Sequence, residues 1–190
     1  MSELFSIQLQ NQQQQGRDGI WLDLPTTTEQ VQAALRQIGI SSDNPQGLFI
    51  SGYFAEEEKR FAIPYNMVLA SNVDELNFLA ARLETLSAGE RAELNAALQA
   101  PQSELSSIGK ITDFPENVEY YVYLPDVRGP AQLGDYYLNR SGMVNMPDEW
   151  KGGINTAQFG RYVAQQEQGA FTQYGYLVKS CLLYTSPSPR

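Results

Sequence analysis

Histidine is absent from the 190 residues of this chain, and cysteine occurs once, at Cys181. Without an imidazole the chain lacks the side chain that titrates nearest neutral pH, which is also the commonest general base and metal ligand. Catalytic triads built on histidine and zinc sites built on histidine and thiolate are therefore excluded. Any chemistry that the protein performs has to come from carboxylates.

Cationic side chains are scarce as well, since 13 Lys and Arg stand against 22 Asp and Glu, giving a net charge of −9. A sequence pI near 4.5 disfavours direct binding to nucleic acid or to an anionic membrane, and it favours basic protein partners. No stretch approaches the roughly 20 apolar residues of a membrane-spanning helix. The N-terminus, MSELFSIQLQ, has neither the basic region nor the apolar region of a signal peptide. We therefore expect a cytoplasmic protein.

The last ten residues, 181–190 (CLLYTSPSPR), show no apolar periodicity and alternate Ser with Pro. They look like the translation of a transposase adapter used in sequencing libraries, and we predict that they are not native. The alternative is a natural Ser/Pro-rich terminus. If the tail is foreign, the native C-terminus beyond about Ser180 is missing. Without Arg190, 12 cationic residues remain against 22 acids, so the net charge becomes −10.

The first part of the chain, 1–61, is predicted to be a small α+β domain with an antiparallel sheet. Period-2 alternation predicts strands at 4–9, 19–24 and 47–55, with a polar loop at 11–19 and an acidic turn at 56–58. Between the second and third strands, Thr27 and Gln30 form a capping box, and Val31 and Ala34 lie on one apolar face with Leu35 and Ile38. This helix should end at Gly39.

The central part, 62–114, changes to helical periodicity. Val73, Leu76, Leu79, Leu83 and Leu86 recur at steps of three or four residues and predict one amphipathic helix. A second capping box, Ser87 with Glu90, opens a helix that ends before Pro101. Its inward face should carry Leu94, Ala97 and Leu98, and its outward face Glu90 and Glu93. A third short helix is expected to begin within 103–108.

The last part, 115–180, is predicted to be a mixed α/β domain. Strands are expected at 118–124 and within 169–178, and helices at 135–138 and 158–166. Tyrosine is concentrated here, which indicates packing with the hydroxyl groups at the rim of the core. The sequence thus predicts the α+β class and three domains, 1–61, 62–114 and 115–180.

A search for chemical motifs gives no catalytic residue, no metal site and no cofactor. Gly152 and Gly153, and the segment 129–134, lack the strand–turn–helix context and the lysine of a phosphate-binding loop. Nothing matches the spacing of a calcium-binding loop. Asp148 and Glu149 could suggest a carboxylate pair for glycoside hydrolysis, but adjacent acids usually point apart.

The acidic residues instead permit an electrostatic role. Duplex DNA carries about one negative charge per 1.7 Å of its axis, and proteins bind it through clustered Lys and Arg. Asp74 and Glu75 lie about ten residues before Glu84, which corresponds to roughly 15 Å along a straight helix. Further acids recur at short intervals from Glu90 to Asp126. This spacing permits imitation of a phosphate backbone without requiring it.

Four stretches in order resemble the ArdA antirestriction family. The most specific is DELNFLAARLETLSAGE at 74–90, within a similar segment that spans 63–107. The others are GIWLDL at 19–24, the stretch 118–124, and FGRYVAQQEQGAFTQYG at 159–175. Together they extend the resemblance over about residues 4–180.

The resemblance implies an elongated, three-part α+β protein, carried by mobile elements and typically homodimeric. Such a protein imitates bent B-form DNA and blocks the DNA-binding groove of Type I restriction–modification enzymes through their methyltransferase core. It needs no cofactor and no direct contact with nucleic acid. By carry-over, the acids that play the part of phosphates would be Asp23, Asp74, Glu75, Glu84, Glu90, Glu93, Asp126, Asp135, Asp148 and Glu149.

Two features depart from the family pattern. The net charge is mild, and cationic residues are scattered among the acids, namely Arg82, Arg91, Lys110, Arg128 and Arg161. Gly160 and Arg161 match the family, so Arg161 is expected to be structural, either buried or bonded to an acid. Two other functions stay open. One is an acidic adaptor that binds a basic protein through its tyrosine-rich last third, and the other is a hydrolase with two carboxyls of raised pKa in a pocket.

Overall fold

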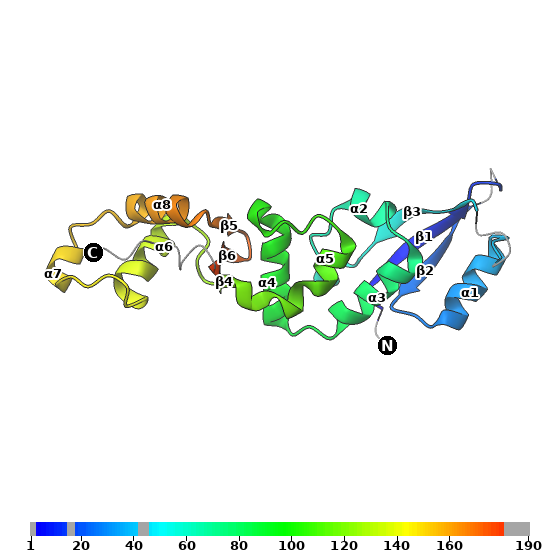
Figure 1. Ribbon diagram of the computed structural model, residues 1–190, viewed down its shortest axis with the longest axis horizontal. Coiled ribbons are helices and arrows are strands. Elements are labelled where there is room, and N and C mark those ends of the chain that lie inside the picture. The colour runs from blue at the N-terminus through cyan, green and yellow to red at the C-terminus, as the bar shows by residue number, and fades with distance from the viewer. Residues whose placement is uncertain (1–2, 15–17, 42–45, 181–190) are drawn as a thin grey trace. The chain divides into compact units, whose positions relative to one another are not determined.

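The computed structural model describes residues 3–14, 18–41 and 46–180 (Figure 1). The predicted foreign tail, 181–190, lies outside the described residues. The fold is α+β, as predicted, with helices and two three-stranded antiparallel sheets in the described part of the chain. The strand orders are β2-β1-β3 and β4-β6-β5.

The chain packs as two compact units. Unit 1 comprises Met1–Ser87 and Ser106–Asp113, and unit 2 comprises Ala88–Leu105 and Phe114–Arg190. The predicted central part, 62–114, contributes helices to both units. These units describe which parts of the chain pack together and do not test the division into three domains, which stays a prediction.

The sheet of unit 1 follows the predicted alternation. Its strands are β1 (Phe5–Asn11), β2 (Ile20–Leu24) and β3 (Leu48–Phe54). One face carries the buried side chains, for example Ile7 paired with Leu22. Because side chains alternate along a strand, Trp21 and Asp23 lie on the other face, where both are exposed.

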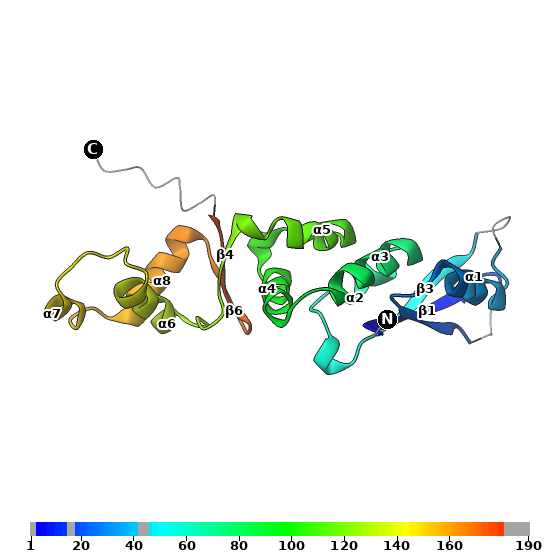
Figure 2. The ribbon, with the colours of Figure 1, turned by 90° about the horizontal axis from the view of Figure 1, so that it is seen from below.

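Helix α1 (Thr28–Gln37) packs against β2 and lies beside the sheet (Figure 2). The predicted capping box is present, because the Thr27 hydroxyl accepts from the Gln30 amide and the Gln30 side chain accepts from the Thr27 amide. Val31 and Ala34 are buried. The helix ends before Gly39, whose φ of +72° is a left-handed conformation that glycine adopts without strain.

Unit 1 also contains the 3₁₀ turn η1 (Glu57–Lys59) and the helices α2 (Tyr65–Leu69), α3 (Val73–Glu84) and α5 (Ile108–Asp113). The apolar stripe predicted for α3 is buried from Val73 to Leu83, with Leu76, Leu79 and Leu83 fully enclosed. Leu86, the last residue of the predicted stripe, lies beyond the end of the helix and is only partly buried. Asn72 caps the helix by accepting from the Glu75 amide at 2.8 Å. Helix α5 packs against α3 and begins at the end of the range expected for a third helix.

Unit 2 begins with α4 (Ala88–Gln99) and the short 3₁₀ turns η2 (Pro101–Ser103), η3 (Phe114–Glu116) and η4 (Val118–Tyr120). Its sheet contains β4 (Tyr121–Leu124), β5 (Ala170–Thr172) and β6 (Gly175–Lys179). The strand expected over 118–124 is therefore wrong in its first half, because the pairing with β6 starts only at Tyr121.

The remaining helices of unit 2 are α6 (Pro130–Asp135), the π-helix η5 (Tyr136–Arg140), α7 (Asp148–Lys151) and α8 (Thr156–Glu167). Helices α6 and α8 lie side by side in both views (Figures 1 and 2). Gly134 and Gly160 stand at this contact, where a Cβ on either would collide with backbone atoms of the other helix. The absence of side chains at these two positions therefore permits the close approach.

A tyrosine–glutamate cluster lies in the core of unit 2. The hydroxyl of Tyr176, a fully enclosed residue, donates to Glu167 at 2.9 Å, and the Tyr137 hydroxyl donates to the other carboxylate oxygen of Glu167. This arrangement agrees with the expectation that tyrosines of the last third serve packing. Both phenols have a raised pKa, first because of burial and then because of Glu167.

Candidate functional site

The predicted phosphate-mimicking acids of unit 1 lie on β2 and α3. Asp23 is exposed near the end of β2. Asp74 and Glu75 occupy the first turn of α3, where the helix dipole favours negative charge. Asp74 is exposed, and Glu75 and Glu84 are partly exposed. All three lie off the buried stripe, as the helical period requires.

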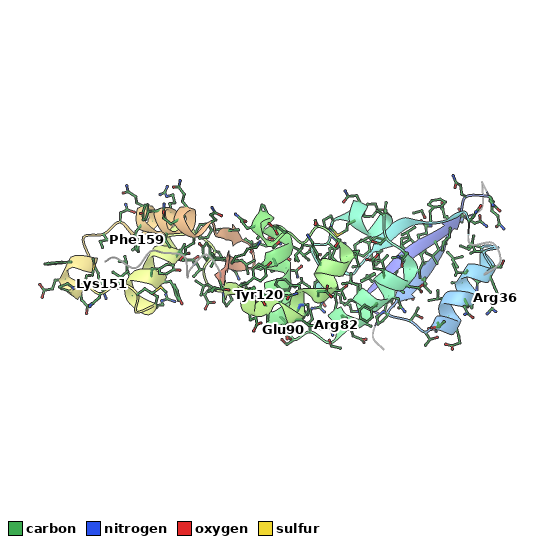
Figure 3. The ribbon with its side chains drawn as sticks, in the orientation of Figure 1. Arg36, Arg82, Glu90, Tyr120, Lys151 and Phe159 are labelled. Atoms are coloured by element: carbon green, nitrogen blue, oxygen red, sulfur yellow. The ribbon has the colours of Figure 1, made fainter. Side chains whose placement is uncertain are left out.

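The other predicted acids lie in unit 2. Glu90 and Glu93 lie on α4, and Asp126 lies in the turn after β4. Asp135 is the last residue of α6, and Asp148 and Glu149 lie in the first turn of α7. Glu90, which Figure 3 labels, is exposed, as are Asp126, Asp148 and Glu149. The same figure labels Lys151 on α7 and Phe159 on α8.

Asp135 and Asp148 each lie against a cation. Asp135 accepts from the Arg140 guanidinium at 3.0 Å, and Asp148 contacts the Lys151 ammonium at 2.8 Å. The hydrogen bond and the charge of Lys151 lower the pKa of the Asp148 carboxyl. A neighbouring cation cancels much of the field that each carboxylate projects, so these two positions resemble phosphates less than an unpaired acid does.

Glu93 reaches the surface only in part, as Glu75 and Glu84 do. It is half-buried, and burial, followed by the nearby Glu90 carboxylate, raises its pKa. Burial and then Glu93 also raise the pKa of the Tyr123 phenol on β4, so this glutamate lies near that phenol. The helical period placed Glu93 off the apolar stripe, but it gave no information about the strand that packs beside that position.

Some of the cationic residues that are scattered among the acids are exposed, and others are partly buried. Arg161 is exposed, and its Nε donates to the Ala157 carbonyl at 3.2 Å. The expectation that Arg161 is buried or bonded to an acid is therefore wrong for the described part of the chain. Arg128 and Lys110 are exposed too, whereas Arg91 is half-buried and burial lowers its pKa.

A further acidic position escaped the sequence analysis. Glu3 and Asp23 both approach the Ser6 hydroxyl, and a groove beside them is lined by the exposed Trp21. Trp21 and Asp23 are two residues apart in GIWLDL, which places both on one face of a strand. That signal was available from the sequence. The approach of Glu3 was not, because it depends on the pairing of β1 with β2.

Within 3–14, 18–41 and 46–180, no group of three or more His, Cys, Asp or Glu is arranged to hold a metal ion. In the same ranges no helix combines the length and the apolarity needed to cross a bilayer.

Comparison with known protein families agrees with the four sequence stretches that resemble the ArdA family. The sequence model of the antirestriction protein (ArdA) family matches residues 15–178, which is most of the chain. No curated protein matches the sequence.

Proposed function

Since the chain belongs to the ArdA family of antirestriction proteins, we propose that it acts as a DNA mimic on Type I restriction–modification enzymes. Its surface carboxylates stand in for phosphates and occupy the DNA-binding groove of the methyltransferase core. None of them acts as a catalyst in this proposal. The protein and its target would meet in the cytoplasm, and the protein would act as a homodimer, as is typical of the family.

The observation that carries the proposal is the exposure or partial exposure of the acids along α3 and in unit 2. Asp74 and Glu84 stand ten positions apart on one helix, and at about 1.5 Å per residue they are separated by roughly 15 Å along its axis. Exposed carboxylates of this kind attract the clustered Lys and Arg that bind duplex DNA.

The ten acids are not expected to contribute equally. Asp135 and Asp148 are paired with Arg140 and Lys151, and Glu93 is half-buried. Asp74 and Asp126 are exposed and make no ion pair within the described residues. We therefore expect Asp74 and Asp126 to matter more for the enzyme than Asp135 and Asp148.

The proposal is tested by competition for DNA. A Type I methyltransferase core is bound to a labelled duplex, and the protein is added at low and at high salt. The expected result is displacement of the duplex at low salt that weakens as salt rises, because screening reduces the attraction between opposite charges. Failure of the folded protein to displace the duplex at low salt would reject the mimic for that enzyme.

Two matched double variants separate local mimicry from net charge. Asp74→Asn with Asp126→Asn removes two unpaired carboxylates, and Asp135→Asn with Asp148→Asn removes two paired ones. Both change the net charge equally. We expect the first to raise the concentration for half-displacement by about 2-fold to 30-fold, since two exposed ionic contacts at about 0.2–1 kcal/mol each contribute about 0.4–2 kcal/mol together. The second should raise it by less than about 2-fold on the same basis. Equal effects would show that only net charge matters.

An acidic adaptor is the second candidate function. The exposed aromatic residues of unit 2, among them Tyr120, Trp150 and Tyr162, favour it, because large exposed apolar groups are enriched where proteins meet. An adaptor would bind the enzyme or another basic protein without displacing DNA. Its binding would survive simultaneous charge reversal of Asp74, Glu75 and Glu84, whereas that of the mimic would fail.

A further inference from the structure

A groove of about 530 Å³ lies in unit 1 beside β2 and the turn that leads into α1. Its lining includes Trp21, Glu3 and Asp23, together with Pro25, Thr26 and Gln30. This volume falls within the range of about 300–1,000 Å³ that small-ligand sites have. The groove therefore combines an aromatic ring with two negative charges in a space large enough for a side chain of a partner.

The indole of Trp21 packs on the outer face of the sheet, over the neighbouring strands. Trp21 pairs with Gln8, and Gln8 pairs with Gly52 on the next strand, so the three residues form one row across the sheet. A Cβ at Gly52 would lie 3.0 Å from Cη2 of Trp21, which means that the ring extends over this glycine. The residue nevertheless stays 52% exposed. The ring is thus supported from the sheet and accessible from the groove.

The two carboxylates share one hydrogen-bond donor. The Ser6 Oγ lies 2.8 Å from Asp23 Oδ1 and 3.3 Å from Glu3 Oε1. A hydroxyl has a single proton, so it donates to only one carboxylate at a time. In the described part of the chain neither acid forms an ion pair. Two anionic groups that converge on one proton repel each other, and a cation placed between them would relieve that repulsion.

We propose that this groove binds the guanidinium group of an arginine side chain from a partner protein. The planar guanidinium stacks on an aromatic ring and donates in a fork to carboxylates, whereas the ammonium of lysine acts as a compact point charge. Trp21 supplies the ring, and Glu3 and Asp23 supply the acceptors. The identity of the partner rests on the proposed function, since DNA-binding surfaces are rich in arginine.

The test uses the full chain and a small probe, so that it does not depend on any restriction enzyme. The ¹⁵N-labelled protein is titrated with Nα-acetyl-arginine amide, with the lysine analogue, and with the neutral citrulline analogue. The indole signal of Trp21 is followed, and that of Trp150, in unit 2, is the internal reference. A Trp150→Phe variant assigns the two signals. We expect saturable shifts of Trp21 and Ser6 with the arginine probe, smaller shifts with lysine and none with citrulline.

Two matched variants locate the binding. Asp23→Asn should weaken binding of the arginine probe about 3-fold, while Asp74→Asn, an equal charge change on α3 of the same unit, should leave it unchanged. Gly52→Ala should reduce the Trp21 shift, because the added methyl displaces the indole. Spectra without probe report whether each variant is folded.

Several results would overturn the proposal. Equal shifts of both indoles, equal weakening by Asp23→Asn and Asp74→Asn, or no response to the arginine probe would each show that the groove does not select a guanidinium. Shifts of Trp21 that depend on protein concentration alone would mean that a second copy of the chain covers this face. If the groove binds arginine but the protein fails to displace DNA, only the proposed function is rejected.

Discussion

The contact between α6 and α8 should not tolerate a single added methyl group. A Cβ at Gly160 would lie 1.8 Å from the Pro130 carbonyl oxygen and 2.7 Å from the Gly134 amide nitrogen. Real Cβ atoms essentially never come closer than 3.0 Å, so the helices would have to separate by about 1.2 Å at this point. The obstructing atoms belong to the backbone, which cannot rotate away as a side chain does.

We therefore expect Gly160→Ala to lower the free energy of unfolding by about 3 kcal/mol, the upper end of the usual cost of overpacking. Gly89→Ala in α4 of the same unit is the matched control, because nothing lies within 4 Å of the Cβ that it adds. Alanine favours a helix over glycine, so the control should gain up to about 1 kcal/mol. The same substitution is thus expected to have opposite signs at the two sites.

Urea-induced unfolding, followed by far-ultraviolet circular dichroism, measures both effects through the midpoint and the slope of the transition. An unfolding free energy for Gly160→Ala within about 1 kcal/mol of the unmodified protein would refute the reasoning, because that value lies at the lower limit for overpacking. It would mean that α6 and α8 separate at little cost, and that the two glycines are not required for their approach.

The other predictions concern buried tyrosines. Glu167→Gln should lower the free energy of unfolding by about 1–3 kcal/mol, because one of the two phenols that donate to Glu167 loses its acceptor. Urea unfolding measures this loss, and adding Tyr137→Phe should recover part of it. An unchanged midpoint for Glu167→Gln would contradict the prediction. Burial raises the pKa of Tyr53 from 10.0 to about 12. The folded state then keeps a proton that the unfolded state loses, so stability is complete below pH 10 and falls between pH 10 and 12, by about 1.4 kcal/mol per pH unit. Within the described residues the Tyr53 hydroxyl has no hydrogen-bond partner, so Tyr53→Phe should leave stability at pH 8 intact and make the alkaline decline shallower in thermal melts.

Local signals predicted the elements that depend on neighbouring residues. The capping box at Thr27 and Gln30 and the left-handed Gly39 define α1 at both ends. Such signals work within one or two helical turns, so they are readable from sequence. The strand predicted from Val118 was wrong in its first three residues, which form a 3₁₀ turn. A strand requires a pairing partner elsewhere in the chain, and the pairing with β6 begins only at Tyr121.

The predicted site was limited in the same way. Helical spacing placed Asp74 on the exposed face of α3, and the four ordered motifs indicated the family that the comparison then matched. Spacing alone did not reveal that Glu93 is partly buried near the Tyr123 phenol of unit 2. Asp148 and Lys151 are three residues apart on one helix, and this spacing by itself predicts their ion pair.

The sequence by itself determined the net negative charge, the exclusion of histidine chemistry, the class of the fold and the family, because composition, short-range periodicity and ordered motifs carry that information. The tertiary structure decided which carboxylates stay exposed. It alone brought Glu3 and Asp23 to the hydroxyl of Ser6. It also gave Gly160 its packing role against α6. These contacts join residues from different elements, and their geometry exists only after the chain has packed.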